Sequence, residues 1–370
     1  MKRKLTAKAL ILPLLVAFLL LLPLLGAAVI GEHRYERHHP AYMRHMWLRL
    51  LGDEESEGQG DPDGEGNVPT ASQQGSTLNV LVVGKDAAAG LTDVMMIASL
   101  NTADHSLELL QIPRDTYARY TDASYKKING AYAKLGGAGL VTFLRENMGV
   151  PIDRYVCVDL AVLGELVDMM GGVRMNVPAD MNYDDPTQNL HIHLEAGEQV
   201  LNGEQAQMFV RYRSGYAMAD LGRMDAQKLF LAALAKQAKE TLTTAQTVNL
   251  VCRCFGKIKT DMGLADCVTY AKQLRSVKVS ALDMATLPGS SARENGQSGA
   301  WYYVLNRAAT EQLLRDTVGL TGEFDVKGVF TDAQKKEFHE IYRASAQSCR
   351  VHRYTAEQAL EGEVTIRRLS

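Results

Sequence analysis

Cysteine is scarce in this sequence, and neither sign of charge prevails. Five cysteines occur among 370 residues, and none has the paired Cys-x-x-Cys spacing of a structural zinc site. This number and spacing also exclude a small domain held together by disulfides. Lysine and arginine number 40 against 43 aspartates and glutamates, so the net charge is only −3. The charge therefore gives no reason to expect a nucleic-acid partner.

What the chain does contain is enough apolar sequence for a folded core. Hydrophobic residues make up 46% of the chain and charged residues 22%, a composition typical of globular proteins. From residue 77 onward, strand-like and helix-like segments alternate. Apolar runs predict strands at residues 78–83, 94–100, 107–112, 154–160, 280–287 and 301–305, and helices at 128–148, 161–170 and 220–241. This alternation predicts an α/β or α+β fold.

The N-terminus contains an uninterrupted apolar run. Residues 9–30 carry no charge and have about the ~20 residues that a helix needs to cross the hydrocarbon core. The basic residues within 1–8 predict that this end stays in the cytoplasm and that the rest lies outside. We therefore predict a single-pass type II membrane protein. A cleaved signal peptide is the alternative, because small residues at 26–28 resemble a cleavage site, but the run is longer than such peptides usually have.

Residues 31–76 separate the predicted anchor from the rest of the chain. Residues 32–51 mix arginines with aromatic and apolar residues, which suits a membrane surface. Their four histidines fit no specific ligand spacing, so a solvated stretch is favoured over a metal site. Residues 52–76 are acidic and rich in Gly, Ser, Pro and Gln, which predicts a flexible linker. We expect an extracellular domain over residues 77–320 and a polar C-terminal tail over residues 321–370.

Two aspartates flank a short Ala/Gly-rich loop between the first two predicted strands. Asp86 follows the first strand and Asp93 precedes the second, so the loop can bring both carboxylates to one edge of the sheet. Oxygen ligands without nearby thiols suit Mg²⁺ or Mn²⁺, especially when phosphate oxygens complete the octahedron. The alternative is that one or both aspartates cap turns, and spacing alone leaves both interpretations open.

Arginines gather near the ends of predicted elements. Arg114 follows the end of an apolar strand, which is a usual place for a ligand contact in an open α/β sheet. Arg211 and Arg213 are two residues apart and would share one face of an extended segment, and Arg223 follows in the next helix. Guanidinium groups repel one another unless anions neutralise them, and phosphate matches their planar fork. The alternative is a solvated basic surface paired with nearby aspartates.

Several short motifs in residues 78–240 occur in the order seen in one protein family. They are Val-Gly-Lys-Asp at 83–86, Thr-Asp-Val-Met-Met at 92–96, Ile-Pro-Arg-Asp-Thr at 112–116, Lys-Ile-Asn-Gly-Ala-Tyr at 127–132, Gly-Gly-Val at 171–173, Asn-Gly-Glu-Gln-Ala at 202–206, Val-Arg-Tyr-Arg at 210–213, and Asp-Leu-Gly-Arg at 220–223 with Gln227. This series resembles the LytR-CpsA-Psr family of cell-wall glycopolymer ligases. Leu91 and Ala226 depart from it, because many members carry arginine there.

The resemblance implies a central mixed β-sheet flanked by helices and a phosphotransferase in cell-wall assembly. Such an enzyme moves a glycopolymer, for example teichoic acid or capsule, from an undecaprenyl pyrophosphate lipid to a peptidoglycan sugar hydroxyl. By resemblance, Asp86 and Asp93 hold Mg²⁺ (or Mn²⁺) against the pyrophosphate, and Asp220 orients arginines or helps to deprotonate the acceptor. The residues expected to bind pyrophosphate are Arg114, Lys127, Arg211, Arg213, Arg223 and Gln227. The expected catalytic residues are Arg114, Asp220, Arg211 and Arg213.

Two other functions and one structural question stay open at this point. The same fold could act as a pyrophosphatase, with water replacing the sugar. It could also be a non-catalytic membrane-anchored protein that binds polyprenyl phosphates or wall polymer or has a regulatory role. The family also encloses the lipid tail between sheet and helices. The candidate lining residues are Phe143, Leu144, Met148, Val162, Leu163, Leu166, Met169 and Met170. Ordinary core packing is the alternative for each of them.

Overall fold

The structure is a computed structural model of the whole chain. It describes residues 77–85, 92–118, 126–186, 190–216, 220–243, 246–247, 250, 253–263, 266–267, 270, 273–274, 276–293, 300–324 and 351–362. The predicted anchor and linker, Asp86 and Leu91 all lie outside these residues. Within the described ranges, no helix combines the length and apolar character needed to cross a membrane.

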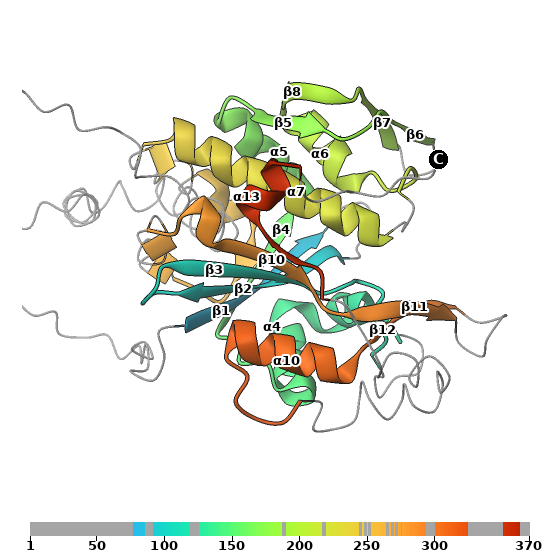
Figure 1. The fold of residues 1–370 in the computed structure, drawn as a ribbon, viewed down its shortest axis with the longest axis vertical. Coiled ribbons are helices and arrows are strands. Elements are labelled where there is room, and N and C mark those ends of the chain that lie inside the picture. The colour runs from blue at the N-terminus through green and yellow to red at the C-terminus, as the bar shows by residue number, and fades with distance from the viewer. Residues whose placement is uncertain are drawn as a thin grey trace, which may run out of the picture.

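A mixed β-sheet forms the centre of the described domain (Figure 1). Its strand order is β13-β10-β3-β2-β1-β4-β9. The bounds are β1 Thr77–Lys85, β2 Thr92–Asn101, β3 Ser106–Gln111, β4 Arg154–Asp159, β9 Lys259–Thr260, β10 Leu282–Thr286 and β13 Arg353–Thr355. The pairs β1–β4 and β3–β10 are parallel and the other pairs are antiparallel. The expected mixed sheet in an α+β fold is therefore confirmed.

Helices cover both faces of this sheet (Figure 1). One face carries α5 Leu160–Met169, α6 Gly203–Arg211, α7 Asp220–Thr241 and α13 Ala356–Leu360, and the other carries α4 Ile128–Met148 and α10 Arg307–Val318. Successive residues of a strand point to opposite faces, so Val80 and Val82 enter the first core while Leu81 and Val83 enter the second. Burial on both sides explains why β1 is an uninterrupted apolar run.

The long helix α4 forms where the sequence predicts it, in spite of its glycines. Gly136 interrupts the helix with a φ of +67°, a left-handed conformation that favours glycine. Gly149 ends the helix with a φ of +71°, and its amide N–H donates to the carbonyl of Arg145. The glycine-rich stretch is thus a kink inside one helix rather than a loop between two.

Three two-stranded hairpins extend the domain. They are β5 Val173–Val177 with β8 Gly197–Leu201, β6 Met181–Asp185 with β7 Leu190–Leu194, and β11 Gly289–Arg293 with β12 Trp301–Leu305. The first two lie beyond α5 and α6, whereas β11–β12 projects from the continuation of β10 (Figure 1). Backbone bonds tie β12 to the loop after β3, because the Tyr303 N–H donates to the Asp115 carbonyl and the Tyr117 N–H to the Tyr303 carbonyl, both at 2.8 Å.

The region predicted as a polar tail contributes to the sheet. Residues 351–362 contain β13, which pairs with β10, and α13, which packs on α7. Arg353 in β13 donates to Glu108 of β3 at 2.8 Å and lies 3.5 Å from Asp283 of β10. The sequence also predicts a helix at residues 332–345, and this segment lies outside the described residues.

Glu108 makes the stability of this sheet edge sensitive to pH. Burial raises the pKa of Glu108 to about 7, because desolvation outweighs the attraction of Arg353, whose side chain is half exposed and therefore partly screened. The folded state thus binds a proton that the unfolded chain releases near pH 4.5. Glu108 stabilises the fold fully below that pH, and the contribution is lost as the pH rises through about 7.

We expect Glu108→Gln to remove this pH dependence. From pH 4.5 to pH 8, the free energy of unfolding of the wild type should fall by about 1–3 kcal/mol relative to the variant. Urea denaturation at both pH values measures it. The exposed Glu357→Gln is the control, and parallel pH profiles for Glu108→Gln and wild type would contradict the assignment.

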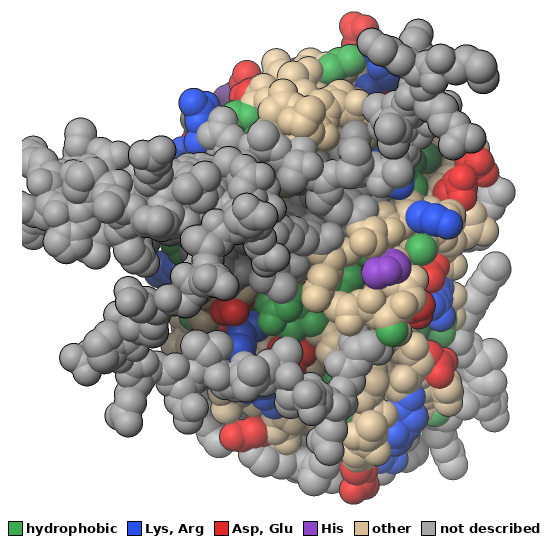
Figure 2. Space-filling view, turned by 90° about the vertical axis from the view of Figure 1, so that its left-hand side faces the viewer, with side chains coloured by type: hydrophobic (Ala, Val, Ile, Leu, Met, Phe, Trp, Pro, Cys, Tyr) green, Lys and Arg blue, Asp and Glu red, His purple; other side chains and the backbone are tan. Residues whose placement is uncertain are grey.

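The described cysteines support no disulfide in this part of the chain. Cys157, Cys254 and Cys267 are buried, and none of the three is in a disulfide. On the side of the molecule shown in Figure 2, charged side chains of both signs are interspersed among the described residues.

Candidate active site

Four charged side chains from β2, the segment after β3 and the helix α7 meet at one end of the sheet. Asp93 is the second residue of β2, Arg114 follows β3, and Asp220 and Arg223 lie in the first turn of α7. Arg114 contacts Asp93 at 2.5 Å and Asp220 at 3.4 Å. Arg223 contacts the same two carboxylates at 3.3 and 2.6 Å. We call these four residues the Arg–Asp cluster.

Burial makes the charges of this cluster depend on one another. The Arg223 side chain is only 4% exposed, whereas those of Arg114, Asp93 and Asp220 are 20–26% exposed. Burial lowers the pKa of Arg223, and Asp220 and Asp93 oppose that effect. Burial also disfavours the charge on Arg114, but Asp220, Asp93 and Asp115 together raise its pKa above the ordinary value. The carboxylates therefore keep both arginines charged in a partly dry site.

The cluster retains hydrogen-bonding capacity that the described residues do not use. Nε and Nη2 of Arg223 and Nε of Arg114 are buried and have no well-aligned acceptor among those residues. Their aspartate contacts are close but poorly directed, so they supply charge neutralisation more than hydrogen bonds. An anion with several oxygens, such as a phosphate, satisfies such donors with better geometry.

Lys127 lies beside the cluster rather than in it. Its ammonium group donates to Asp115 at 2.8 Å and lies 5.7 Å from the centre of the Tyr302 ring. Lys127 is the N-cap of α4, and the Asn129 N–H in the same turn donates to the Arg114 carbonyl at 3.2 Å. Asp115 thus links the predicted Lys127 to Arg114, a role that its place in the Ile-Pro-Arg-Asp-Thr motif could have indicated.

Arg211 and Arg213 do not both lie on an extended segment, so the shared face that such a segment would give them is not formed. Arg211 is the last residue of α6, because the Tyr212 N–H still donates to the Met208 carbonyl at 3.1 Å. Only after Arg211 does the backbone extend, and the Tyr212 ring is buried against Tyr216. Arg213 is exposed and near enough to Arg223 to lower its pKa. It therefore adds positive charge at the mouth of the cluster.

Gln227 has protein partners at both ends of its amide. Its Nε2 donates to the Val210 carbonyl at 3.0 Å, and its Oε1 accepts from Gln111 Nε2 at 2.8 Å. The side chain is 4% exposed and joins β3, α6 and α7. This arrangement supports a positioning role for Gln227 and identifies Gln111 as a partner that sequence reasoning missed.

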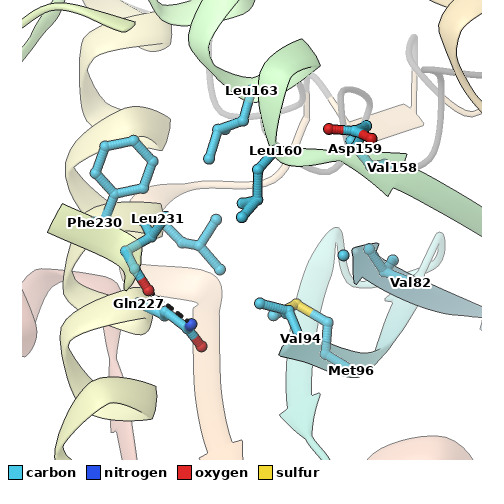
Figure 3. A pocket seen from close by; sticks show the side chains of 12 residues that line it. Val82, Val94, Met96, Val158, Asp159, Leu160, Leu163, Gln227, Phe230 and Leu231 are labelled. Carbon is cyan, nitrogen blue, oxygen red and sulfur yellow. Dashed lines mark hydrogen bonds between the residues drawn. The ribbon is translucent and has the colours of Figure 1, made fainter. Parts of the chain in front are cut away.

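An apolar pocket lies between the sheet and α7 (Figure 3). It encloses about 560 Å³ of space not filled by atoms, including its open mouth. The lining residues are Val82, Gly84, Val94, Met96, Val158, Asp159, Leu160, Leu163, Val210, Gln227, Phe230 and Leu231. Of the eight candidate tail-lining residues, Leu163 lines this pocket. Leu144 and Met148 instead pack on the opposite face of the sheet.

One face of α7 joins the pocket to the Arg–Asp cluster. Asp220, Arg223, Gln227 and Leu231 follow at spacings of three or four residues, which places them along one stripe of the helix. The charged end of the stripe holds the cluster and the apolar end lines the pocket. The geometry therefore suits a ligand with an anionic head and an apolar tail.

Asp93 has the chemistry to hold a divalent cation. Within the described ranges, both arginine contacts fall on its Oδ1, and Oδ2 is left for another ligand. Among the described residues, no three His, Cys, Asp or Glu side chains form a metal site by themselves. Mg²⁺ commonly takes one or two carboxylates and completes its shell with water and substrate phosphate, so this donor set fits it.

Comparisons with known proteins agree with the motifs and the fold. The LytR_cpsA_psr family profile matches residues 52–318. The polyisoprenyl-teichoic acid–peptidoglycan teichoic acid transferase TagV of Bacillus subtilis is 27% identical over 205 residues, which are 54% of this chain and 52% of TagV. The chain thus spans about half the length of that relative. TagU of Bacillus cereus, which is also named a polyisoprenyl-teichoic acid–peptidoglycan teichoic acid transferase, is 26% identical over 258 residues, 68% of this chain and 82% of TagU.

The solved structure of B. subtilis TagV shares the fold. Its TM-score is 0.57 at 23% identity, and the match covers 67% of this chain and all of the TagV chain in that structure. The family profile covers well over half of the sequence and includes the strands, the arginines and the helix that build the site. The chain belongs to the LytR-CpsA-Psr family.

Proposed function

We propose that this protein is a phosphotransferase that moves a glycopolymer from a polyprenyl pyrophosphate lipid to a sugar hydroxyl of peptidoglycan. The observation that carries the proposal is the single face of α7 that joins the Arg–Asp cluster to the apolar pocket. A lipid pyrophosphate needs both environments side by side. The transferase names of TagV and TagU support the same reaction.

The cluster has the groups that such a transfer requires. The acceptor hydroxyl oxygen attacks the phosphorus that carries the glycopolymer, the bond from this phosphorus to the bridging oxygen breaks, and the lipid phosphate leaves. Arg114 and Arg223 turn from their aspartates to the phosphate oxygens and neutralise the developing charge. Asp220, released from these arginines, accepts the hydroxyl proton.

Asp93 and Asp86 hold Mg²⁺ in this proposal. The available Oδ2 of Asp93 and the fit of its donor set support the first ligand, whereas Asp86 rests on the motif alone. When bound, the cation neutralises negative charge on the pyrophosphate. Residues 9–30 anchor the chain as a type II membrane protein, so that the catalytic domain meets its lipid substrate and peptidoglycan outside the cell.

The deciding experiment follows both products with the full chain in detergent micelles. A lipid-pyrophosphate glycan donor is supplied with and without peptidoglycan oligomers, with Mg²⁺ or with EDTA. We expect polymer-linked peptidoglycan only with acceptor and Mg²⁺. Phosphate release without transfer would support a pyrophosphatase instead, and binding without turnover would support a non-catalytic protein. A C-terminal reporter found in the cytoplasm would contradict the proposed topology.

Filling the apolar pocket should weaken use of the lipid donor. Leu163→Trp replaces an aliphatic side chain with a larger indole ring that fills part of the pocket. We therefore expect KM for a long-tailed donor to rise roughly 10-fold, with a smaller change for a short-tailed donor. Ala161→Trp adds the same ring to the exposed face of α5 and serves as the control. Equal KM values for both tail lengths in Leu163→Trp would show that the pocket holds no tail.

A further inference from the structure

The hairpin β11–β12 presents an aromatic ring to solvent beside the loop that carries Arg114. Trp301 is 53% exposed, more than any other large hydrophobic side chain among the described residues. Arg293 lies directly across from it in the register, with its guanidinium carbon 5.0 Å from the centre of the Trp301 ring. Arg293 and Ser291 are also exposed, and all three residues share one face of the hairpin.

The opposite face of the hairpin is fixed to the site. Tyr302 packs edge-on against Tyr117, with ring centres 5.0 Å apart, and Lys127 lies over the Tyr302 ring. The Tyr303 backbone bonds to residues on both sides of Thr116, so β12 runs parallel to the segment that begins at Arg114. Trp301 lies two residues before Tyr303, and Arg114 likewise lies two residues before Thr116. Chain geometry therefore keeps the Cα atoms of Trp301 and Arg114 within about 20 Å.

We propose that Trp301, Arg293 and Ser291 form a binding platform for the phosphate-bearing polyol or sugar chain of the donor glycopolymer. This inference rests on the proposed function, because it assigns the polymer a path away from the Arg–Asp cluster. The indole face suits the C–H groups of sugars or polyols. The guanidinium group suits the phosphates that link such units, and it distinguishes this polymer from an uncharged glycan. The packing of Tyr302 holds the platform rigid before the polymer binds.

Tryptophan fluorescence tests the platform directly. The chain has two tryptophans, Trp47 and Trp301, so the full chain with Trp47→Phe reports on Trp301 alone. The probes are poly(glycerol phosphate), dextran, peptidoglycan oligomers and inorganic phosphate. We expect a saturable change in emission with poly(glycerol phosphate), lost in Arg293→Gln, and little response to the others. An unchanged emission, or a response to dextran or peptidoglycan oligomers alone, would overturn the proposal.

Transfer kinetics separate this inference from the proposed function. We expect Trp301→Ala to raise KM roughly 10-fold for a donor with a long polymer, without changing kcat or the KM of a donor with one sugar. Trp301→Phe should recover most of the loss, and the exposed Leu135→Ala is the matched control. Normal transfer with equal KM in wild type and Trp301→Ala would refute the platform alone. Polymer binding without transfer by the wild type would refute the proposed function and leave the platform standing.

Discussion

Replacement of Arg114 by alanine should lower kcat for glycopolymer transfer by roughly 100- to 1,000-fold, the usual loss when a donor to developing charge is removed. Arg114 contacts both carboxylates of the cluster. Without it, Arg223 is the arginine of the cluster that still pairs with Asp93 and Asp220. The site then has one guanidinium fewer for the pyrophosphate. Steady-state kinetics with the lipid donor measure the effect.

Two further variants separate catalysis from stability. Arg114→Lys keeps the charge but loses the planar guanidinium group, so we expect a kcat between those of Arg114→Ala and the wild type. Arg174→Ala removes an exposed arginine of β5, outside the cluster, and should leave kcat unchanged. A wild-type kcat in Arg114→Ala would remove the cluster from the mechanism.

The largest loss of stability should follow from Asp225→Asn. The Lys228 side chain is 1% exposed, and its ammonium group contacts Asp225 at 2.9 Å and the Thr286 hydroxyl at 2.6 Å. It also lies 5.3 Å from the centre of the Tyr354 ring. Removing the carboxylate leaves a buried charge without its counterion, which costs about 3–5 kcal/mol in the free energy of unfolding. Urea denaturation at pH 7 measures the change.

A second substitution tests the reason for this loss. Lys228→Met removes the buried charge, so the double variant with Asp225→Asn should recover most of the stability that Asp225→Asn loses. Asp283→Asn changes a surface aspartate that pairs weakly with Arg353 and should shift stability by less than about 1 kcal/mol. A double variant as unstable as Asp225→Asn would show that packing, rather than charge, sets the cost.

Local periodicity predicted much of the fold. The predicted helices at 128–148 and 220–241 have the bounds of α4 and α7, and the apolar runs at 78–83 and 301–305 lie in β1 and β12. The helices form from hydrogen bonds between near neighbours, and the apolar runs reflect the burial of β1 and β12, so a single sequence reveals both. The strand β13 could not be found in this way. It has three residues, shows no alternation, and depends on pairing with β10, about 70 residues earlier.

The sequence predicted which residues form the site better than it predicted how they are arranged. The motifs brought Arg114, Asp220 and Arg223 to one place, as the cluster shows. The conformation of Arg211 depended on one backbone hydrogen bond that continues α6, and no spacing pattern reveals such a bond. Of the tail-lining candidates, those on α5 include Leu163 of the pocket, whereas Phe143, Leu144 and Met148 lie on α4, which packs on the opposite face of the sheet. An apolar stripe shows that a helix is buried but not which face of the sheet it covers.

The short strands at the two ends of the sheet have a consequence for self-association. An open edge strand presents unpaired N–H and C=O groups on which a second chain can add its own strand. In the part of the chain that the structure describes, the outer strand next to β10 is β13, with three residues, and the outer strand next to β4 is β9, with two. Each of these edges is too short to serve as a template. On the proposed membrane surface, copies of the chain would meet often in two dimensions. Edges of this kind allow such crowding without joining one sheet to the next.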